Sequence, residues 1–215
     1  VGDLHCSRET SKGSLQPLFA QAAQDADVLL LCGDLTDYGL PEEAQLLIHE
    51  MQAAERIPIV AVLGNHDYES GHAEEVSRIL TDAGVHLLDG GSLELHGIGF
   101  AGVKGFVGGF GRNALQAWGE PSLKQVVREA SDEALKLERA LARLRSTKRV
   151  ALLHYSPILS TVEGEPPAIY SYLGSSRLEE PLNRYQVTAV FHGHAHHGRA
   201  EGRTSGNVPV YNVAM

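Results

Sequence analysis

Short apolar runs recur along the chain and alternate with stretches in which apolar residues follow a helical spacing. Several of these runs are nearly continuous in Val, Ile and Leu, which is typical of strands that are buried on both faces. We therefore predict strands over Val28–Cys32, Ile57–Leu63, Val85–Leu88, Val150–Leu153 and Val187–Phe191.

The stretches between the runs predict helices. Pro41 suits a first helical turn, and the apolar residues that follow it lie on one face, so we predict a helix over Pro41–Arg56. A second pattern covers His72–Ala83 and stops at Gly84, as a C-terminal glycine cap requires. A longer pattern, from about Pro121 to Arg145, predicts a third helix.

The remaining segments predict a hairpin and two long loops. Residues 92–103 alternate between apolar and small or polar positions, as strands exposed on one face do. Residues 102–119 are rich in glycine, and residues 156–176 show no sustained period, so we interpret both as loops, the second as a functional one. Because no internal repeat is present, we predict a layered α/β domain with mixed sheets.

Length and charge narrow the class of protein. A chain of 215 residues with 43% apolar residues favours one domain over residues 1–215. The formal net charge of -9 argues against nucleic acid as a partner, because polyanion binding relies on clustered Lys and Arg. No run approaches the roughly 18 apolar residues of a membrane span, so we expect no membrane partner. The oligomeric state stays open.

Cysteine content indicates a compartment. Cys6 and Cys32 are too few for a disulfide framework, so we predict two free thiols and a cytoplasmic location. Val1 stands where an initiator Met is expected and Asp-Leu-His follows almost at once, so we expect residues to be missing at both ends. A signal peptide upstream of Val1 therefore stays open.

Residue types that bind metals follow the predicted strands. They are Asp34, Asn65 to Asp67, His154, and His192 to His197. Ligands of α/β sheets bind beyond the carboxyl ends of strands, so separate loops deliver these side chains to one place. Mixed oxygen and nitrogen donors suit Mn, Fe or Zn, and the set is too large for one ion, which points to two ions that share a carboxylate.

Five blocks occur in a recognisable order. They read D-L-H at Asp3–His5, G-D-L-T-D at Gly33–Asp37, G-N-H-D at Gly64–Asp67, a lone His154, and G-H-A-H at Gly193–His196. In these blocks the sequence resembles the calcineurin-like metallophosphoesterases over nearly its whole length. The resemblance implies a β-sandwich of two mixed sheets flanked by helices, an αββα fold. Any single block would be weak evidence for the family, whereas five blocks in this order are improbable by chance.

The resemblance also implies roles for the residues of the blocks. Asp34 would bridge two ions, His66 would contact the substrate phosphate and protonate the departing oxygen, and Asp67 would orient His66 by hydrogen bonding. Two ions about 3.5 to 4 Å apart can hold a bridging hydroxide for in-line attack on phosphorus. One ion would take Asp3, His5 and His196, and the other Asn65, His154 and His194.

Some of these residue types also have structural interpretations. Taken singly, Asp3, His5 and Asp34 could be loop caps, and a lone histidine is usually structural. His192 and His197 are interpreted as exposed rather than as neighbours of the ligands. Ser156 lacks a G-x-S-x-G elbow and is interpreted as a loop residue. Four more histidines are expected at the surface: His49, His72, His86 and His96. Three residues of the glycine-rich loop are candidate substrate contacts: Arg112, Asn113 and Trp118.

Differences between this sequence and the motifs of related branches limit the predicted substrate class. Purple acid phosphatases carry D-x-G and a tyrosine ligand in G-D-x-x-Y, whereas His5 and Asp37 stand at those positions here. Protein Ser/Thr phosphatases carry G-D-x-V-D-R-G, and the arginine is absent here. We therefore predict a two-metal hydrolase of a phosphodiester in a small molecule or nucleotide. The alternatives are a phosphomonoesterase on a small substrate and a non-catalytic metal-binding scaffold.

Overall fold

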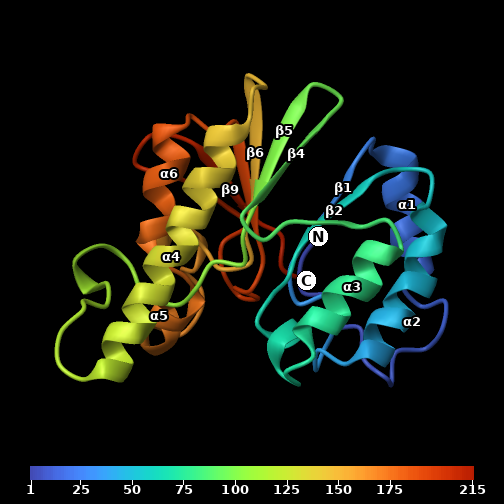
Figure 1. Cartoon of the computed structure of the whole chain (residues 1–215), viewed down its shortest axis with the longest axis horizontal. Helices are drawn as coiled ribbons and strands as arrows, with labels where there is room; N and C mark the ends of the chain where they lie inside the picture. Colours follow the sequence, from blue (N-terminus) through green and yellow to red (C-terminus); the bar gives the residue numbers. More distant parts are fainter.

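The computed structural model describes all residues from 1 to 215 and has four layers, with helices outside two facing sheets (Figure 1). One half contains α1 (Gln16–Asp25), α2 (Pro41–Met51) and α3 (Ala73–Asp82) beside β1 (Leu29–Cys32), β2 (Ile59–Val62) and β3 (His86–Leu87). The other half contains β4 (Gly91–Leu95), β5 (Ile98–Gly102), β6 (Lys148–Leu152), β7 (Ala189–His192), β8 (Glu201–Arg203) and β9 (Pro209–Asn212), covered by α4 (Pro121–Arg143) and α6 (Glu179–Arg184). The expected αββα class is confirmed.

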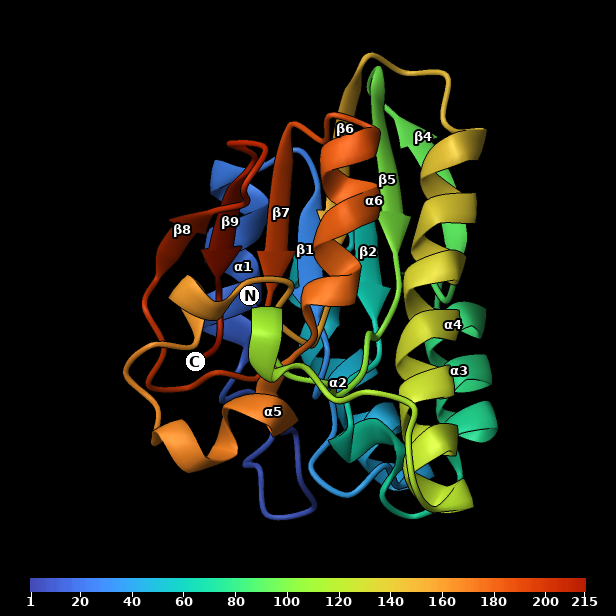
Figure 2. The same ribbon diagram turned by 90° about the vertical axis from the view of Figure 1, so that its left-hand side faces the viewer.

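Strand direction places the ends of many strands at one edge. The first sheet has the order β1-β2-β3 and is parallel throughout. The second has the order β4-β5-β6-β7-β9-β8, in which β4 and β8 are antiparallel edge strands and the inner four are parallel. In Figure 2 the arrowheads of β2, β5, β7 and β9 point toward the same end of the molecule. The loops after these strands therefore gather on one side.

Alternation along the strands divides the core into three parts. On β2, Val60 and Val62 face the second sheet, whereas Ile59 and Ala61 face the helices α1 to α3. On β6, Leu152 belongs to the layer between the sheets, whereas Ala151 packs toward α4 and α6. Successive strand side chains point to opposite faces, so two-sided burial needs apolar residues at every position. That requirement explains the continuous apolar runs.

Helix α1 was not predicted, and its start shows why. Its N-terminal segment has no side-chain cap of its own. The buried carboxylate of Glu50 in α2 accepts the amides of Gly13, Leu15 and Gln16 at 2.6, 2.9 and 3.2 Å. The free amides at this helix start are thus satisfied from α2, 34 residues away from Gln16. A cap supplied by tertiary contact leaves no local signal in the sequence.

The chain start lies between the two sheets. The amide of Cys32 donates to the carbonyl of Val1 at 2.8 Å, and the amide of Gly2 donates to the carbonyl of Val213 at 2.8 Å. Gly2 also pairs with Ala214, so the first and last residues of the chain lie side by side (Figure 1). This position carries the side chains of residues 3 to 5 to the edge where β1 and β7 end.

The two predicted loops hold each other. Around Gly109, the amide of Gly108 donates to the carbonyl of Ser171 and that of Gly109 to the carbonyl of Gly174, at 2.9 and 2.8 Å. The second loop contains the short helix α5 (Tyr170–Leu173) and several single turns. No helix in the structure combines the length and the apolar character that crossing a bilayer needs.

Truncation of an inter-sheet residue tests the layered core. Leu152 is fully buried in the layer between the sheets, whereas Leu135 on α4 is 45% exposed. We expect Leu152→Ala to lower the free energy of unfolding by about 2–5 kcal/mol, and Leu135→Ala to change it by less than about 0.5 kcal/mol. Urea unfolding of the metal-free protein, followed by circular dichroism, measures both; equal losses would contradict this core.

Candidate metal centre

The candidate ligands stand in the loops that follow parallel strands. Asp34 lies two residues after β1, Asn65 three after β2, His154 two after β6 and His194 two after β7. Asp3 and His5 come from the N-terminal segment, whose amides donate to the carbonyls of Gly33 and Asp34 at 2.9 and 3.0 Å. The structure therefore brings together residues that are distant in the chain, such as Asp3 and His194, which lie 191 positions apart.

Four of these residues adopt a left-handed backbone. Seven residues other than glycine have positive φ, and four of them are the candidate ligands Asp3, His5, Asp34 and His194, at 59°, 45°, 49° and 71°. Left-handed φ costs an L-residue roughly 1–2 kcal/mol, and such strain gathers at functional sites. The tight loops at this edge therefore hold these residues in a left-handed backbone in spite of its conformational cost.

Two glycines of the motif blocks leave room for carboxylates. A Cβ on Gly64 would stand 2.1 Å from Oδ1 of Asp34, and one on Gly193 would stand 2.3 Å from Oδ2 of Asp3. Any side chain at either position would displace a candidate ligand. The glycines that precede Asn65 and His194 are thus required by close approach.

A first group of donors consists of Asp3, His5 and His196, whose ligand atoms all lie within 4.8 Å of one another. Nε2 of His196 stands 3.5 Å from Oδ1 of Asp3. Its Nδ1 donates to the carbonyl of Met215 at 2.8 Å, which leaves the lone pair on Nε2. The ring is therefore fixed in the form that can bind a cation beside Asp3.

A second group consists of Asp34, His154 and His194, again within 4.8 Å. Nδ1 of the fully buried His154 donates to the carbonyl of Cys32 at 3.0 Å, so the lone pair lies on Nε2. That atom faces Oδ1 of Asp34 at 3.4 Å and Oδ1 of Asn65 at 2.8 Å. Electron-pair donors that converge in this way repel one another unless a proton or cation lies among them.

Asp34 lies where the two groups meet. Its other oxygen, Oδ2, stands 3.9 Å from Nε2 of His5, a member of the first group. The carboxylate therefore faces donors of both groups, one with each oxygen. In the second group, Nε2 of His194 donates to the carbonyl of Tyr172 at 3.2 Å, which leaves Nδ1 as its free donor. These donor types and positions fit two transition or divalent cations.

Burial shifts the titration of the ligands. Desolvation raises the pKa of Asp34 to about 7 and that of Asp3 to about 6. Burial, together with the neighbouring imidazoles, lowers the pKa of His194 to about 4 and holds that of His154 well below its usual range. These two histidines are thus neutral near pH 7 and ready to coordinate, while the carboxylates hold protons to higher pH than free ones, protons that a cation would displace.

The partner of His66 differs from the predicted one. Nδ1 of His66 donates to the carbonyl of Asp37 at 2.6 Å, and the Asp37 carboxylate lies 3.9 Å away. The expectation that Asp67 orients His66 by hydrogen bonding is wrong. The fully buried Asp67 carboxylate instead accepts the amides of Leu35, Thr36 and Gly64 and the Thr36 hydroxyl, joining the two loops after β1 and β2.

Asp37 was quoted within a motif block but given no role. Its carboxylate stands 3.3 Å from Nδ1 of His5 and 3.9 Å from Nδ1 of His66. Burial lowers the pKa of His66, but the hydrogen bond to the Asp37 carbonyl and the charges of Asp34 and Asp37 outweigh it, so the net pKa is raised. The position of Asp37 in the G-D-L-T-D block, three residues after Asp34, was a usable sign that it belongs to the site. The carbonyls of Cys32 and Tyr172, which accept from His154 and His194, are backbone groups and left no sign in the sequence.

The histidines outside the two donor groups differ in burial. His192 is fully buried, so the interpretation that it is exposed is wrong; its ring bonds to the Gly193 carbonyl and to the Thr161 hydroxyl, at 2.7 and 2.8 Å. Burial lowers its pKa to about 4. Ser156 donates within its own loop, as expected of a loop residue. The histidines expected at the surface are exposed: His49, His72, His86, His96 and His197.

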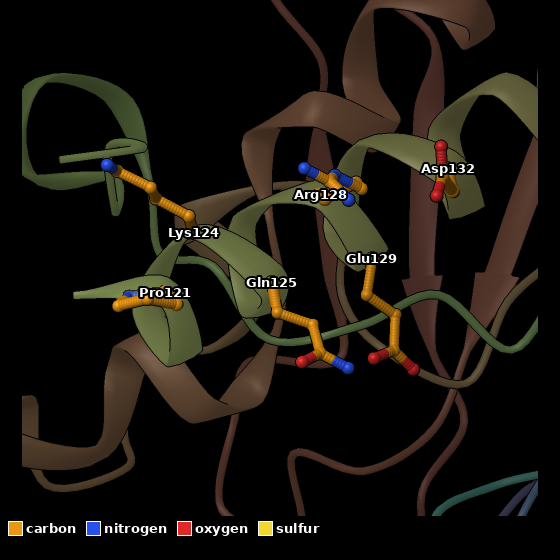
Figure 3. A pocket seen from close by; sticks show the side chains of 6 residues that line it. All are labelled: Pro121, Lys124, Gln125, Arg128, Glu129 and Asp132. Carbon is orange, nitrogen blue, oxygen red and sulfur yellow. The ribbon is translucent and has the colours of Figure 1, made fainter. Parts of the chain in front are cut away.

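Other surface features lie outside this constellation. Figure 3 shows a polar hollow lined by six side chains from the first half of α4, from Pro121 to Asp132, and none of the candidate ligands lines it. Arg112, Asn113 and Trp118 are exposed and bond to none of the ligands, so their contact with substrate stays a prediction. The two cysteines are free and buried, which confirms the expected thiols.

Solved structures with the same fold are distant in sequence. Phosphopantetheinyl hydrolase from Mycobacterium tuberculosis is 14% identical, with a TM-score of 0.66 over 100% of this chain and 87% of that one. The protein TT1561 of Thermus thermophilus is 16% identical, with a TM-score of 0.56 over 97% and 86%. A 5′-nucleotidase, so described provisionally, from Staphylococcus aureus is 14% identical, with a TM-score of 0.56 over 99% and 47%.

These likenesses show the fold alone, and no curated protein matches the sequence. The model of one family, the calcineurin-like phosphoesterases, matches residues 1–198, a range that contains every motif block from Asp3 to His196. The recognised blocks, the αββα layers and the clustered His and Asp donors agree with that match. The chain therefore belongs to the calcineurin-like phosphoesterase family and is a metal-dependent hydrolase of phosphoester bonds.

Proposed function

We propose that the protein uses two metal ions to hydrolyse a phosphodiester in a small molecule or nucleotide. The observation that carries this proposal is the meeting of two donor groups at Asp34, which offers one oxygen to each. A shared carboxylate of this kind is what a pair of ions needs in order to lie close together.

The ligands divide between the two ions as the groups do. Asp34 is shared, and the donor set of nitrogen and oxygen suits Mn, Fe or Zn. The first ion would be held by Asp3, His5 and His196, and the second by Asn65, His154 and His194. Such ions would neutralise the phosphate and lower the pKa of a water for in-line attack on phosphorus.

His66 supplies the proton in this proposal. Its Nδ1 is fixed by the Asp37 carbonyl, so Nε2 is the nitrogen left to face a substrate. The raised pKa keeps a proton available on the ring, as a general acid for the leaving oxygen requires. Asp37 holds His66 and His5 in place, and Asp67 holds the loops together beneath them.

The charges around the site favour a diester. No arginine or lysine bonds to any candidate ligand or to His66, so at the scissile phosphate the ions would supply the positive charge. A phosphodiester carries one negative charge, whereas a monoester carries about two at neutral pH. The overall charge of -9 also favours compact substrates over nucleic acid strands.

Hydrolysis of two chromogenic esters tests the reaction. We expect the Mn-loaded protein to cleave bis-p-nitrophenyl phosphate with a higher kcat/KM than p-nitrophenyl phosphate, and a chelator to abolish both activities. Asp34→Asn should lose bound metal and turnover, whereas Asp132→Asn, an exposed carboxylate on α4, should retain both. A preference for the monoester would favour the phosphomonoesterase alternative, and no turnover with full metal content would favour the scaffold.

Removal of His66 separates proton transfer from metal binding. We expect His66→Ala to lower kcat by about 10²- to 10⁴-fold while the metal content, measured by elemental analysis, stays unchanged. His197→Ala removes an exposed histidine from the loop after β7 and should leave kcat within about twofold of the original. Unchanged turnover in the His66 variant would contradict its assignment.

The raised pKa values of the carboxylates predict a pH dependence of metal uptake. An ion must displace protons from Asp34 and Asp3, whose pKa values are about 7 and about 6, so Mn affinity should rise up to about pH 7 and then level off. The lowered pKa values of the buried histidines act on stability in the opposite direction to those of the carboxylates, so the prediction concerns affinity alone. Calorimetric titration with Mn at several pH values measures the affinity, and a pH-independent affinity would contradict the prediction.

A further inference from the structure

Lys104 stands beside the second donor group. It follows the end of β5 by two residues, at the same edge of the sheets as the candidate ligands. Its carbonyl accepts the amides of both His154 and Tyr155, each at 3.0 Å. The backbone that carries this lysine is therefore fixed to the loop that carries His154.

The ammonium group is held by aromatic rings. Nζ lies 4.7 Å from the ring centroid of Phe106, 5.2 Å from that of Tyr155 and 5.4 Å from that of Tyr68. Rings at these distances attract a cation and limit where its side chain can go. Three rings thus hold the charge in one place, whereas a surface lysine moves freely.

The charge of Lys104 has no carboxylate partner. Its one hydrogen bond within the protein goes to the carbonyl of Gly105, at 3.1 Å, although an ammonium group carries three donors. The nearby carboxylate of Glu133 is already used by the amide of Gly105 and by Lys136, at 2.8 and 2.7 Å. The lysine is therefore a partly buried cation with donors to spare.

The three rings around Lys104, those of Phe106, Tyr155 and Tyr68, form an aromatic frame that reaches the second donor group. The ring of Tyr155 lies 4.6 Å from that of His194 and 5.3 Å from that of His154, between centroids. Tyr68 follows His66 by two residues and is 43% exposed, so the frame is open to solvent on that side. One tyrosine ring thus separates the ammonium group from the second donor group.

We propose that Lys104 is a specificity-determining residue that binds a second phosphate group of the substrate, so the substrate class is a phosphodiester that carries a further phosphate. This inference rests on the proposed function, because it places the scissile phosphate at the donor groups. A second anion would take the unused donors and neutralise the uncompensated charge.

Two matched diesters test the proposal. They are the p-nitrophenyl ester of thymidine 5′-phosphate and the same ester with an added 3′-phosphate. We expect kcat/KM to be at least about tenfold higher for the second ester, since a hydrogen bond to a charged group contributes that much. In Lys104→Met, which keeps the apolar stem among the rings, the ratio of the two values should fall by about tenfold.

Control variants separate charge from structure. Lys124→Met removes an exposed lysine on α4, shown in Figure 3, and should leave the ratio unchanged. Lys104→Arg keeps the positive charge and should retain most of the ratio. A lysine with only a structural role would lower both values equally, so an unchanged ratio in Lys104→Met would overturn the proposal. If neither Lys104→Met nor Lys104→Gln folds, a ratio near one in the unaltered protein would overturn it.

Binding distinguishes failure of this proposal from failure of the proposed function. If the Mn-loaded protein cleaves neither ester, the proposed function is wrong, and titration then decides the role of Lys104. The Kd for thymidine 3′,5′-bisphosphate should be at least about tenfold lower than that for thymidine 5′-phosphate, and Lys104→Met should remove the difference. Equal Kd values in the unaltered protein would overturn the proposal.

Discussion

The structure depends on the close approach of polar loops at one edge of two packed sheets. Carboxylates of Asp3 and Asp34 lie against the α-carbons of Gly193 and Gly64, where no side chain fits. Burial raises the pKa of both carboxylates because it disfavours their charged forms. The left-handed backbone of four candidate ligands adds a conformational cost. The apolar layers on each side must outweigh these costs, and cations among the donors would relieve the electrostatic part.

The sequence predicted the architecture well where a pattern is local. Continuous apolar runs marked β1, β2, β6 and β7 because both faces of these strands are buried. Helix α1 was missed because its cap is Glu50 of α2, and α6 because Pro181 interrupts its short pattern. The last strand, β9, was missed because it begins at Pro209 and only Val210 of its residues is buried, so no continuous apolar run marks it.

The candidate site was predictable in its members and less so in its internal bonds. The motif blocks named the residues that meet, because their order follows the strands whose ends share an edge. They could not show that His66 bonds to Asp37 while Asp67 joins the loops, since both aspartates stand in motif blocks. Nor could they show His192 as buried, because its polar partners, Thr161 and the Gly193 carbonyl, come together only in the fold.

The N-terminal segment that lies between the sheets has a consequence for biosynthesis. Asp3 meets the amide of His194 across 191 positions of sequence, and Gly2 pairs with Ala214. Contacts of such long range form late, because the loop between them must close first. Because each donor group includes His194 or His196, neither could be complete until nearly all of residues 1–196 had left the ribosome, so the capture of ions would have to wait for the C-terminal sheet.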